Sequence, residues 1–265
     1  KKWIDIENEL KRFALDDKGK NILFNKTEKD FELLRVSLCD YLSSLSYESI
    51  NKESAACMLI ESVINNYLFK KVYTYNYTDL EKIIDILDVK KTFNNQIEIE
   101  YVHGKVNDKS IILGFEDSAE VKDDYLFMIK SFSRHFRSHN IQYDMILADE
   151  VIFFGHSLGS TDYHYFEHFF RNQSNEQIKK EDSKIITIFT YDNKSRLEIL
   201  TQLRSMNEKK TNLLFSLNQL NIFCTKDGEG DKERIEEYCK NLKTKGIAAQ
   251  KEIISKTAVD QRKKG

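Results

Sequence analysis

The sequence has 265 residues, of which 32% are charged and 12% aromatic, and its formal net charge is −2. This length suits one large α/β domain or two small ones with a sizeable core. The near-zero net charge gives no reason to expect nucleic acid or an anionic membrane as a partner. No apolar run approaches the length of a membrane span, and no signal peptide opens the sequence, so we expect a globular, cytoplasmic protein.

Glycine and cysteine are used sparingly. Proline is absent and glycine occurs only nine times, so the position of each glycine is informative. Because glycine has no Cβ atom, we expect it where the backbone approaches another group closely. Four glycines lie at or beside predicted strand ends: Gly104, Gly114, Gly155 and Gly159. The four cysteines have no C-x-x-C spacing, which favours free buried thiols in a reducing cytoplasm, and we expect no metal.

The first third of the chain is predicted to be helical. Apolar residues recur at helical spacing in three stretches, at about 3–13, 27–45 and 52–67. We interpret residues 1–70 as a helical module that is packed on, or inserted into, an α/β core over residues 71–245. Residues 246–265 are predicted to form a frayed tail.

The predicted core alternates strands and helices. Runs of β-branched and aromatic residues predict strands at about 71–76, 97–102, 111–113, 151–154, 184–191 and 221–224. Amphipathic patterns predict helices at about 80–87, 122–139, 141–148, 162–170, 195–206, 213–220 and 232–242. This order of strands and helices predicts an α/β fold with a Rossmann-like, mainly parallel sheet.

The most distinctive stretch follows the strand at 151–154. Gly155-His156-Ser157-Leu158-Gly159 fits the G-x-S-x-G nucleophile elbow, which would make Ser157 the nucleophile of a hydrolase. In that fold the acid and the histidine follow the serine in the chain. Here the only later histidines, His164 and His168, lie too close in the sequence to reach back over Ser157. We therefore interpret the glycines as a turn at the edge of a ligand site, and the sequence does not favour a serine hydrolase.

Polar residues follow three of the predicted strands. They are Asn76 and Asp79 after the first strand, His103 after the second, and Ser157 and Asp162 after the strand at 151–154. The carboxyl ends of parallel strands share one edge of a sheet, so we expect these side chains to face one crevice. Four of them also have a structural alternative. Asn76 or Asp79 could cap the next helix, His103 could be a loop histidine, and Asp162 could be an acid of the first helical turn.

These segments also carry a resemblance to a known family. The most specific motif is Gly155-His156-Ser157-Leu158-Gly159-x-x-Asp162-x-x-Tyr165-Phe166. Shorter motifs in the same order are Trp3-x-Asp5-Ile6-Glu7, Tyr75-Asn76-Tyr77-Thr78-Asp79, Val102-His103-Gly104 and Ile112-Leu113-Gly114-Phe115. Together they resemble the AbiH family of phage abortive-infection proteins, over about residues 3–225.

The resemblance implies a fold and a chemistry. AbiH proteins are similar to sirtuin-like NAD-binding domains, so it implies a sirtuin-like fold with NAD as substrate. Carried over by position, Asn76 would place a water or the nicotinamide, and His103 would be the base. The implied reaction cleaves the nicotinamide–ribose bond through an oxocarbenium-like state. The residues implied to bind the cofactor are Asp79, Gly104, Gly155, Ser157 and Asp162.

The biological role implied by the resemblance is anti-phage defence through hydrolysis of NAD, with a phage or host protein as trigger and a homo-oligomer as one option. Family members carry a strand and a Gly-Asn-Gly-Phe-Asp-type loop before the helix that corresponds to residues 3–13. No glycine precedes Gly19, so either such a loop precedes Lys1 or the protein lacks it. The alternative function is a non-catalytic sensor or scaffold. A nuclease is a weaker alternative, because we find no carboxylate–lysine group with suitable spacing.

Overall fold

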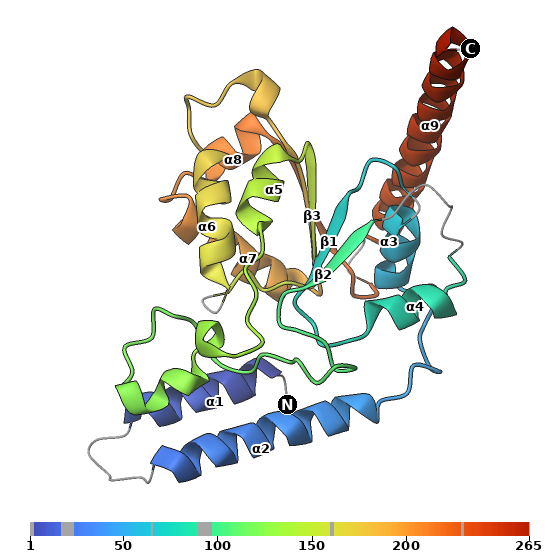
Figure 1. Cartoon of the computed structure of the whole chain (residues 1–265). Coiled ribbons are helices and arrows are strands. Elements are labelled where there is room, and N and C mark those ends of the chain that lie inside the picture. The colour runs from blue at the N-terminus through green and yellow to red at the C-terminus, as the bar shows by residue number, and fades with distance from the viewer. Residues whose placement is uncertain are drawn as a thin grey trace.

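The computed structural model describes residues 3–16, 24–64, 66–89, 97–159, 162–228 and 231–264. Its strands form two parallel sheets, and helices lie on both sides of them (Figure 1). One sheet pairs β1 (Lys71–Thr74) with β2 (Glu98–Tyr101). The other has the order β3 (Glu150–Phe154), β4 (Ile185–Thr190) and β5 (Gln219–Cys224). The prediction of an α/β fold with mainly parallel strands is confirmed.

Nine α-helices are found in the described residues. They are α1 (Trp3–Asp16), α2 (Phe24–Ser43), α3 (Ala55–Ile64), α4 (Leu80–Ile86), α5 (Ile141–Leu147), α6 (Tyr163–Asn172), α7 (Asn193–Met206), α8 (Thr211–Leu217) and α9 (Lys232–Lys264). Aspartate side chains start two of them. Asp79 accepts a hydrogen bond from the N–H of Lys82 at the start of α4, and Asp192 accepts one from the N–H of Ser195 in α7. Both satisfy amide groups that a helix leaves unpaired at its N-terminus.

The central strand β4 shows why the two faces of its sheet are both covered. Its sequence, Ile-Ile-Thr-Ile-Phe-Thr, is β-branched and apolar almost throughout, and every residue after Ile185 is buried. Such a continuous run is typical of a parallel strand packed on both faces. On one face Ile186 and Ile188 pack with Phe166 and Leu203, from α6 and α7. On the other face the strand packs against α3 and α9.

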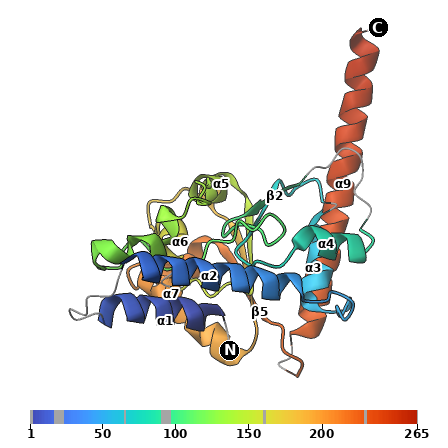
Figure 2. The same ribbon diagram turned by 60° about the horizontal axis from the view of Figure 1, so that its bottom comes forward.

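Helices α1 and α2 lie elsewhere, across the edge of the strands that carries their carboxyl ends (Figure 2). They pack against each other and against the segment 106–129, through residues that include Leu10, Phe31 and Leu38. By contrast, α3 packs on a face of the sheets beside α9. The apolar faces of the three N-terminal helices are therefore buried against different parts of the core, and the division into a helical module over residues 1–70 and a separate core stays a prediction.

Two segments differ from the elements that we expected. Residues 111–113 are buried but are not a strand, and 122–139 is not an α-helix. Instead it contains short 3₁₀ helices, Asp123–Met128 and Lys130–Phe132. The reason is a tertiary pairing: the N–H of Phe115 donates to the carbonyl of Met128, and the N–H of Lys130 donates to the carbonyl of Phe115. These bonds occupy peptide groups that a continuous helix would need for itself.

The C-terminal helix is longer than expected. It was predicted to end near Leu242 and to be followed by a frayed tail, but α9 continues to Lys264 and extends away from the rest of the molecule (Figures 1 and 2). The stretch lacks proline, which would interrupt it. Its one interior glycine, Gly246, lies against Asn66, and the side-chain amide of Asn66 donates to the carbonyl of Leu242.

Two expectations from the composition can be compared with the structure. All four cysteines lie in the described part of the chain, where each is buried and none forms a disulfide, as expected. Among the helices that the structure describes, none is both long and apolar enough to cross a bilayer.

The turn after β2 tests the expectation about glycine. Gly104 has φ of +78°, and a Cβ atom there would lie 2.0 Å from the carbonyl oxygen of Ser110. Gly155 has φ of +62°, but nothing lies within 4 Å of its Cβ position.

We expect Gly104→Ala to lower the free energy of unfolding by about 3 kcal/mol, since it adds a backbone clash to an unfavourable φ. The matched control Gly155→Ala should cost about 1 kcal/mol. Urea denaturation measures both, and equal costs would contradict the role of the close approach.

Candidate active site

The loops that follow β1, β2 and β3 meet at one edge of the strands. Tyr75, just after β1, connects them. The centroid of its ring lies 5.5 Å from that of His103, after β2, and 4.5 Å from that of His156, after β3. Its hydroxyl group is buried and has no hydrogen-bond partner in the described residues. The predicted convergence of the three strand ends therefore brings two histidines and a tyrosine together.

The pair His103 and Asp162 lies at the centre of this edge. The Nε2 atom of His103 is 3.2 Å from Oδ1 of Asp162, and both residues are buried. Asp162 is the residue before α6, but its carboxylate makes no capping bond to that helix. Its other oxygen, Oδ2, lies 3.6 Å from Nε2 of His156. Asp162 thus lies at the N-terminus of α6, as its structural alternative expected, and its carboxylate is at the same time a buried acceptor between two histidines.

A lysine and a glutamate complete a buried cluster of charges. Nζ of Lys130 lies 3.7 Å from Oδ1 of Asp162 and 3.5 Å from Nε2 of His103. The same Nζ lies 3.3 Å from Oε1 of Glu7 on α1. Both side chains are largely buried, with 9% of Lys130 and 12% of Glu7 exposed. We call Glu7, His103, Lys130, His156 and Asp162 the edge cluster.

The edge cluster shifts the protonation of its members. Burial alone would raise the pKa of Asp162, but hydrogen bonds to His103 and His156 and the charge on Lys130 together lower it far below its usual range. Burial lowers the pKa of His103, although its bond to Asp162 opposes this change. Burial raises the pKa of Glu7 to about 7, against the attraction of Lys130. At neutral pH, Asp162 is therefore an anion and His103 is a neutral imidazole.

This protonation state assigns the tautomer of His103. An ionised carboxylate only accepts hydrogen bonds, so the proton of the neutral imidazole lies on Nε2 and is donated to Asp162. The second ring nitrogen, Nδ1, is then the basic atom. A carboxylate that orients a histidine and stabilises its protonated form is a common arrangement for a general base. The edge cluster can therefore accept a proton from a group that reaches Nδ1.

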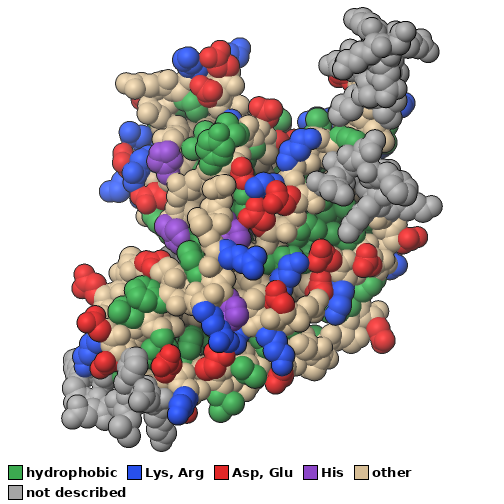
Figure 3. Space-filling model, in the orientation of Figure 1, with side chains coloured by type: hydrophobic (Ala, Val, Ile, Leu, Met, Phe, Trp, Pro, Cys, Tyr) green, Lys and Arg blue, Asp and Glu red, His purple; other side chains and the backbone are tan. Residues whose placement is uncertain are grey.

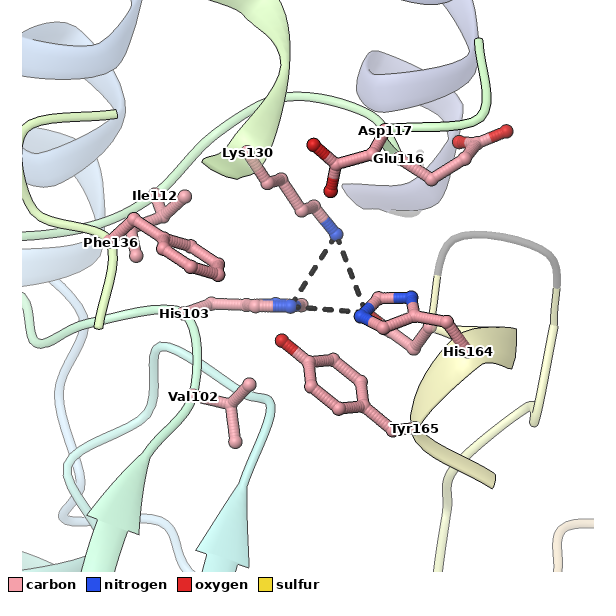
Figure 4. A pocket seen from close by; sticks show the side chains of 10 residues that line it. Val102, His103, Ile112, Glu116, Asp117, Lys130, Phe136, His164 and Tyr165 are labelled. Carbon is pink, nitrogen blue, oxygen red and sulfur yellow. Dashed lines mark hydrogen bonds and ion pairs between the residues drawn. The ribbon is translucent and has the colours of Figure 1, made fainter. Parts of the chain in front are cut away.

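A pocket that is open to solvent lies beside the pair (Figure 4). It is small, with an enclosed volume of about 10 Å³ that has room for about one water molecule, and its lining includes His103, Asp162 and Lys130 together with Glu116 and Tyr165. One oxygen of Glu116, Oε1, pairs with Lys11 of α1. The other, Oε2, is buried and has no hydrogen-bond partner among the described residues. An unpaired buried carboxylate oxygen in a pocket wall is a ready acceptor for a ligand hydroxyl.

The other residues predicted for the site lie outside the lining of this pocket. Asn76 is exposed between Tyr75 and Tyr77, whose rings both lie beside His103. Asp79 caps α4 and accepts a bond from Nδ2 of Asn107, so its structural alternative is the one observed. Gly104 belongs to the tight turn described above. Gly155 and Ser157 are exposed in the loop after β3.

The loop after β3 also differs from a nucleophile elbow. The nucleophile of an elbow occupies the strained position of a sharp turn. Here the positive φ angles fall on Gly155 (62°) and Leu158 (51°), on either side of Ser157. Oγ of Ser157 accepts a bond from the N–H of Gly159, and the nearby His156 uses Nδ1 to accept a bond from the N–H of Leu158. This arrangement supports the prediction that Ser157 is not a nucleophile.

Sequence reasoning missed Lys130, Glu116 and the role of Glu7. Lys130 was placed on a predicted helix, where a lysine is usually exposed. Glu116 directly follows the apolar run at 111–115, and this was its only signal. Glu7 belongs to a quoted motif, but no role was assigned to it. No group of three or more histidine, cysteine, aspartate or glutamate side chains suitable for a metal ion occurs in the part of the chain that the structure describes.

Comparisons with known proteins do not identify a function for this chain, so a functional assignment must be argued from the geometry of the site. No protein-family model, no curated protein and no solved structure matches this chain. The resemblance to AbiH proteins thus rests on the quoted motifs. Of their residues, the structure brings His103 and Asp162 into direct contact.

The buried lysine generates a first prediction for the site. Lys130→Met leaves the carboxylates of Glu7 and Asp162 without their shared cation, and at pH 8 we expect a loss of about 3 kcal/mol in the free energy of unfolding. It should also raise the pKa of His103, because the charge of Lys130 lowers that pKa.

The control is Lys243→Met, which removes an exposed pair with Glu61 and should cost less than about 1 kcal/mol. Denaturation and an NMR titration of His103 measure the effects, and an unchanged pKa would contradict the assigned contact.

The raised pKa of Glu7 predicts a pH dependence. In the unfolded chain its pKa is near 4.5, and in the folded protein it is about 7. Its favourable contribution to stability is therefore complete below pH 4.5 and is lost as the pH rises through 7, by about 3 kcal/mol. Glu7→Gln does not titrate, so its stability relative to the natural protein should rise between pH 4.5 and 8. The exposed control Glu9→Gln should stay within about 0.5 kcal/mol of the natural protein throughout. Parallel stability curves for Glu7→Gln would refute the assignment.

Proposed function

We propose that the protein is an AbiH-type anti-phage defence protein with a sirtuin-like fold, and that it hydrolyses NAD to nicotinamide and ADP-ribose. The observation that carries the proposal is the pair His103 and Asp162 beside an open pocket at the carboxyl edge of parallel strands. Ligands of open α/β sheets bind at this edge. Two parallel sheets with helices on both faces are consistent with a Rossmann-like arrangement.

The chemistry needs one proton acceptor. During hydrolysis the bond between C1′ of the ribose and the nicotinamide nitrogen breaks, and nicotinamide leaves as a neutral molecule with the bonding electrons. Water forms the new bond to C1′ and gives its proton to a base. In this proposal Nδ1 of His103 takes that proton, and Asp162 stabilises the resulting imidazolium. The anion of Asp162 also favours the cationic, oxocarbenium-like state.

Other residues have supporting roles in the proposal. The unpaired oxygen of Glu116 would accept a hydrogen bond from a ribose hydroxyl, which would satisfy it. Asn76, beside the rings that flank His103, would place the water or the nicotinamide. Gly155 and Ser157 would approach the adenosine or phosphate side. Acidic and basic side chains are interspersed over the described residues of the face in Figure 3, which offers no broad basic field for a nucleic acid.

A non-catalytic sensor or scaffold is the second candidate. The observation in its favour is that the charges of the edge cluster compensate one another, with Lys130 shared by Glu7 and Asp162. Such a cluster can fix the position of α1 against the strands without any reaction. If the protein is a scaffold, replacing His103 should change the stability of the fold, and there should be no turnover of NAD to lose.

Nicotinamide release from NAD separates the two candidates. His103→Gln is preferable to alanine because His103 is buried, and glutamine can still donate a hydrogen bond to Asp162. We expect His103→Gln to lower the rate by about a hundredfold or more, the usual effect of losing a general base. Asn76→Ala should lower it similarly without loss of stability, because Asn76 is exposed. Lys243→Met, which removes only the surface pair with Glu61, is the control and should stay within about twofold of the natural rate.

The same variants should be tested in infected cells, because a defence protein can require a trigger. The enzyme predicts that cellular NAD falls during infection and that His103→Gln abolishes both this fall and protection. Protection that persists in folded His103→Gln, with cellular NAD unchanged, would refute the enzyme and favour the scaffold.

A further inference from the structure

His156 is the member of the edge cluster for which no role has yet been assigned, and one of its ring nitrogens is already occupied. Its Nδ1 atom accepts a hydrogen bond of 2.9 Å from the N–H of Leu158. A ring nitrogen that accepts a hydrogen bond carries no proton, so we assign the proton of the neutral imidazole to Nε2. The tautomer of His156 is thus set by the backbone of its own loop.

The backbone conformation that makes this bond is uncommon. Leu158 has φ of 51°, in the left-handed region, which costs about 1–2 kcal/mol for a residue with a Cβ atom. Its side chain is fully buried in the same core cluster as Phe166 and Ile188, and this burial offsets the cost. Tertiary packing therefore holds the N–H of Leu158 toward the ring of His156.

The ring of His156 is also held by two aromatic neighbours. Its centroid lies 4.5 Å from that of Tyr75 and 4.9 Å from that of Phe166, with interplanar angles of 74° and 75°. These are edge-to-face arrangements, which aromatic pairs prefer. Only 13% of the His156 side chain is exposed. Rotation of the ring would break these contacts and the bond from Leu158, so Nε2 keeps one direction.

That direction leads to Asp162. Nε2 of His156 lies 3.6 Å from Oδ2 of Asp162, which is slightly longer than a normal hydrogen bond but close enough for the N–H dipole to attract the carboxylate. The other oxygen, Oδ1, lies 3.2 Å from Nε2 of His103 and 3.7 Å from Nζ of Lys130. Each oxygen of the carboxylate thus faces a different partner, and rotation of the side chain away from them would lose contacts on both sides.

An aspartate in this place has a competing direction. Asp162 is the residue before α6, where an aspartate commonly turns to accept hydrogen bonds from the first amides of the helix. The positive end of the helix dipole also attracts its charge. In the structure the carboxylate makes no capping bond and faces the histidines instead. The observed direction therefore needs partners that outweigh a helix cap.

We infer that His156 is a positioning residue, whose Nε2–H group holds the carboxylate of Asp162 toward His103 and away from the first turn of α6. His156 is not a second base, because neither of its nitrogens can take a proton without losing the contact that it makes. The two histidines therefore have different roles: His103 accepts the proton on Nδ1, and His156 keeps Asp162 in line with it. The consequence for catalysis rests on the proposed function, whereas the positioning itself does not.

The natural protein provides the first test. Nitrogen NMR of isotope-labelled histidine rings distinguishes the two ring nitrogens and shows which of them carries the proton. At about pH 8, where an imidazole is normally neutral, we expect the proton of His156 on Nε2. A proton on Nδ1 would overturn the inference, because the bond from Leu158 would then be absent.

Two substitutions separate positioning from packing. His156→Leu keeps much of the bulk of the ring but removes the donor, while His156→Gln keeps an N–H group that can reach Asp162. Burial lowers the pKa of His103 and the bond to Asp162 raises it. We therefore expect His156→Leu to lower the pKa of His103 further, and His156→Gln to leave it near its natural value. With NAD as substrate, His156→Leu should lower kcat by about tenfold to a hundredfold and change KM by less than about twofold.

His168→Leu is the matched control. His168 is an exposed histidine on α6 that contacts Asn172, so its loss should leave the pKa of His103 unchanged. An unchanged pKa of His103 in folded His156→Leu would overturn the inference, and so would an equal shift in His156→Gln. If His156→Leu does not fold, the tautomer in the natural protein decides. Absence of NAD hydrolysis in the natural protein would refute the proposed function and leave these NMR results unaffected, so the two failures are distinguishable.

Discussion

The carboxylate of Asp162 is the constraint on which the arrangement of the edge depends. A charge removed from water must be compensated, and Asp162 lies among His103, His156 and Lys130, which come from three separate segments. Lys130 in turn contacts Glu7, which ties α1 to the same point. The position of the N-terminal helices and the geometry of the candidate site are therefore coupled through one group of charges.

The same coupling sets the chemistry that the site can perform. Burial keeps His103 neutral, while Asp162 is available to stabilise its protonated form. That combination suits a general base near neutral pH. An open pocket and an unpaired oxygen on Glu116 distinguish the site from a fully satisfied structural cluster. They are the reasons for preferring an enzyme over a scaffold.

The candidate site also depends on how the two sheets are held together, because its residues come from both of them. β1 and β2 carry Tyr75 and His103, whereas the loop after β3 carries His156 and leads to Asp162. The two halves of the site are joined by side chains that pack in the same hydrophobic clusters and by helices on both faces of the sheets.

The sequence alone determined the parallel strands, because runs such as Ile185–Thr190 have the β-branched composition of strands buried on both faces. It also determined that His103 and Asp162 lie at one edge, since parallel strands end together. Features that depend on contacts between distant segments were decided only by the tertiary structure. Pairing of Phe115 with 128–130 replaced a predicted helix, and Lys130 became a buried partner of residues more than twenty positions away in the chain. Periodicity reports which face of an element is apolar, whereas the burial of a charge depends on which distant groups compensate it.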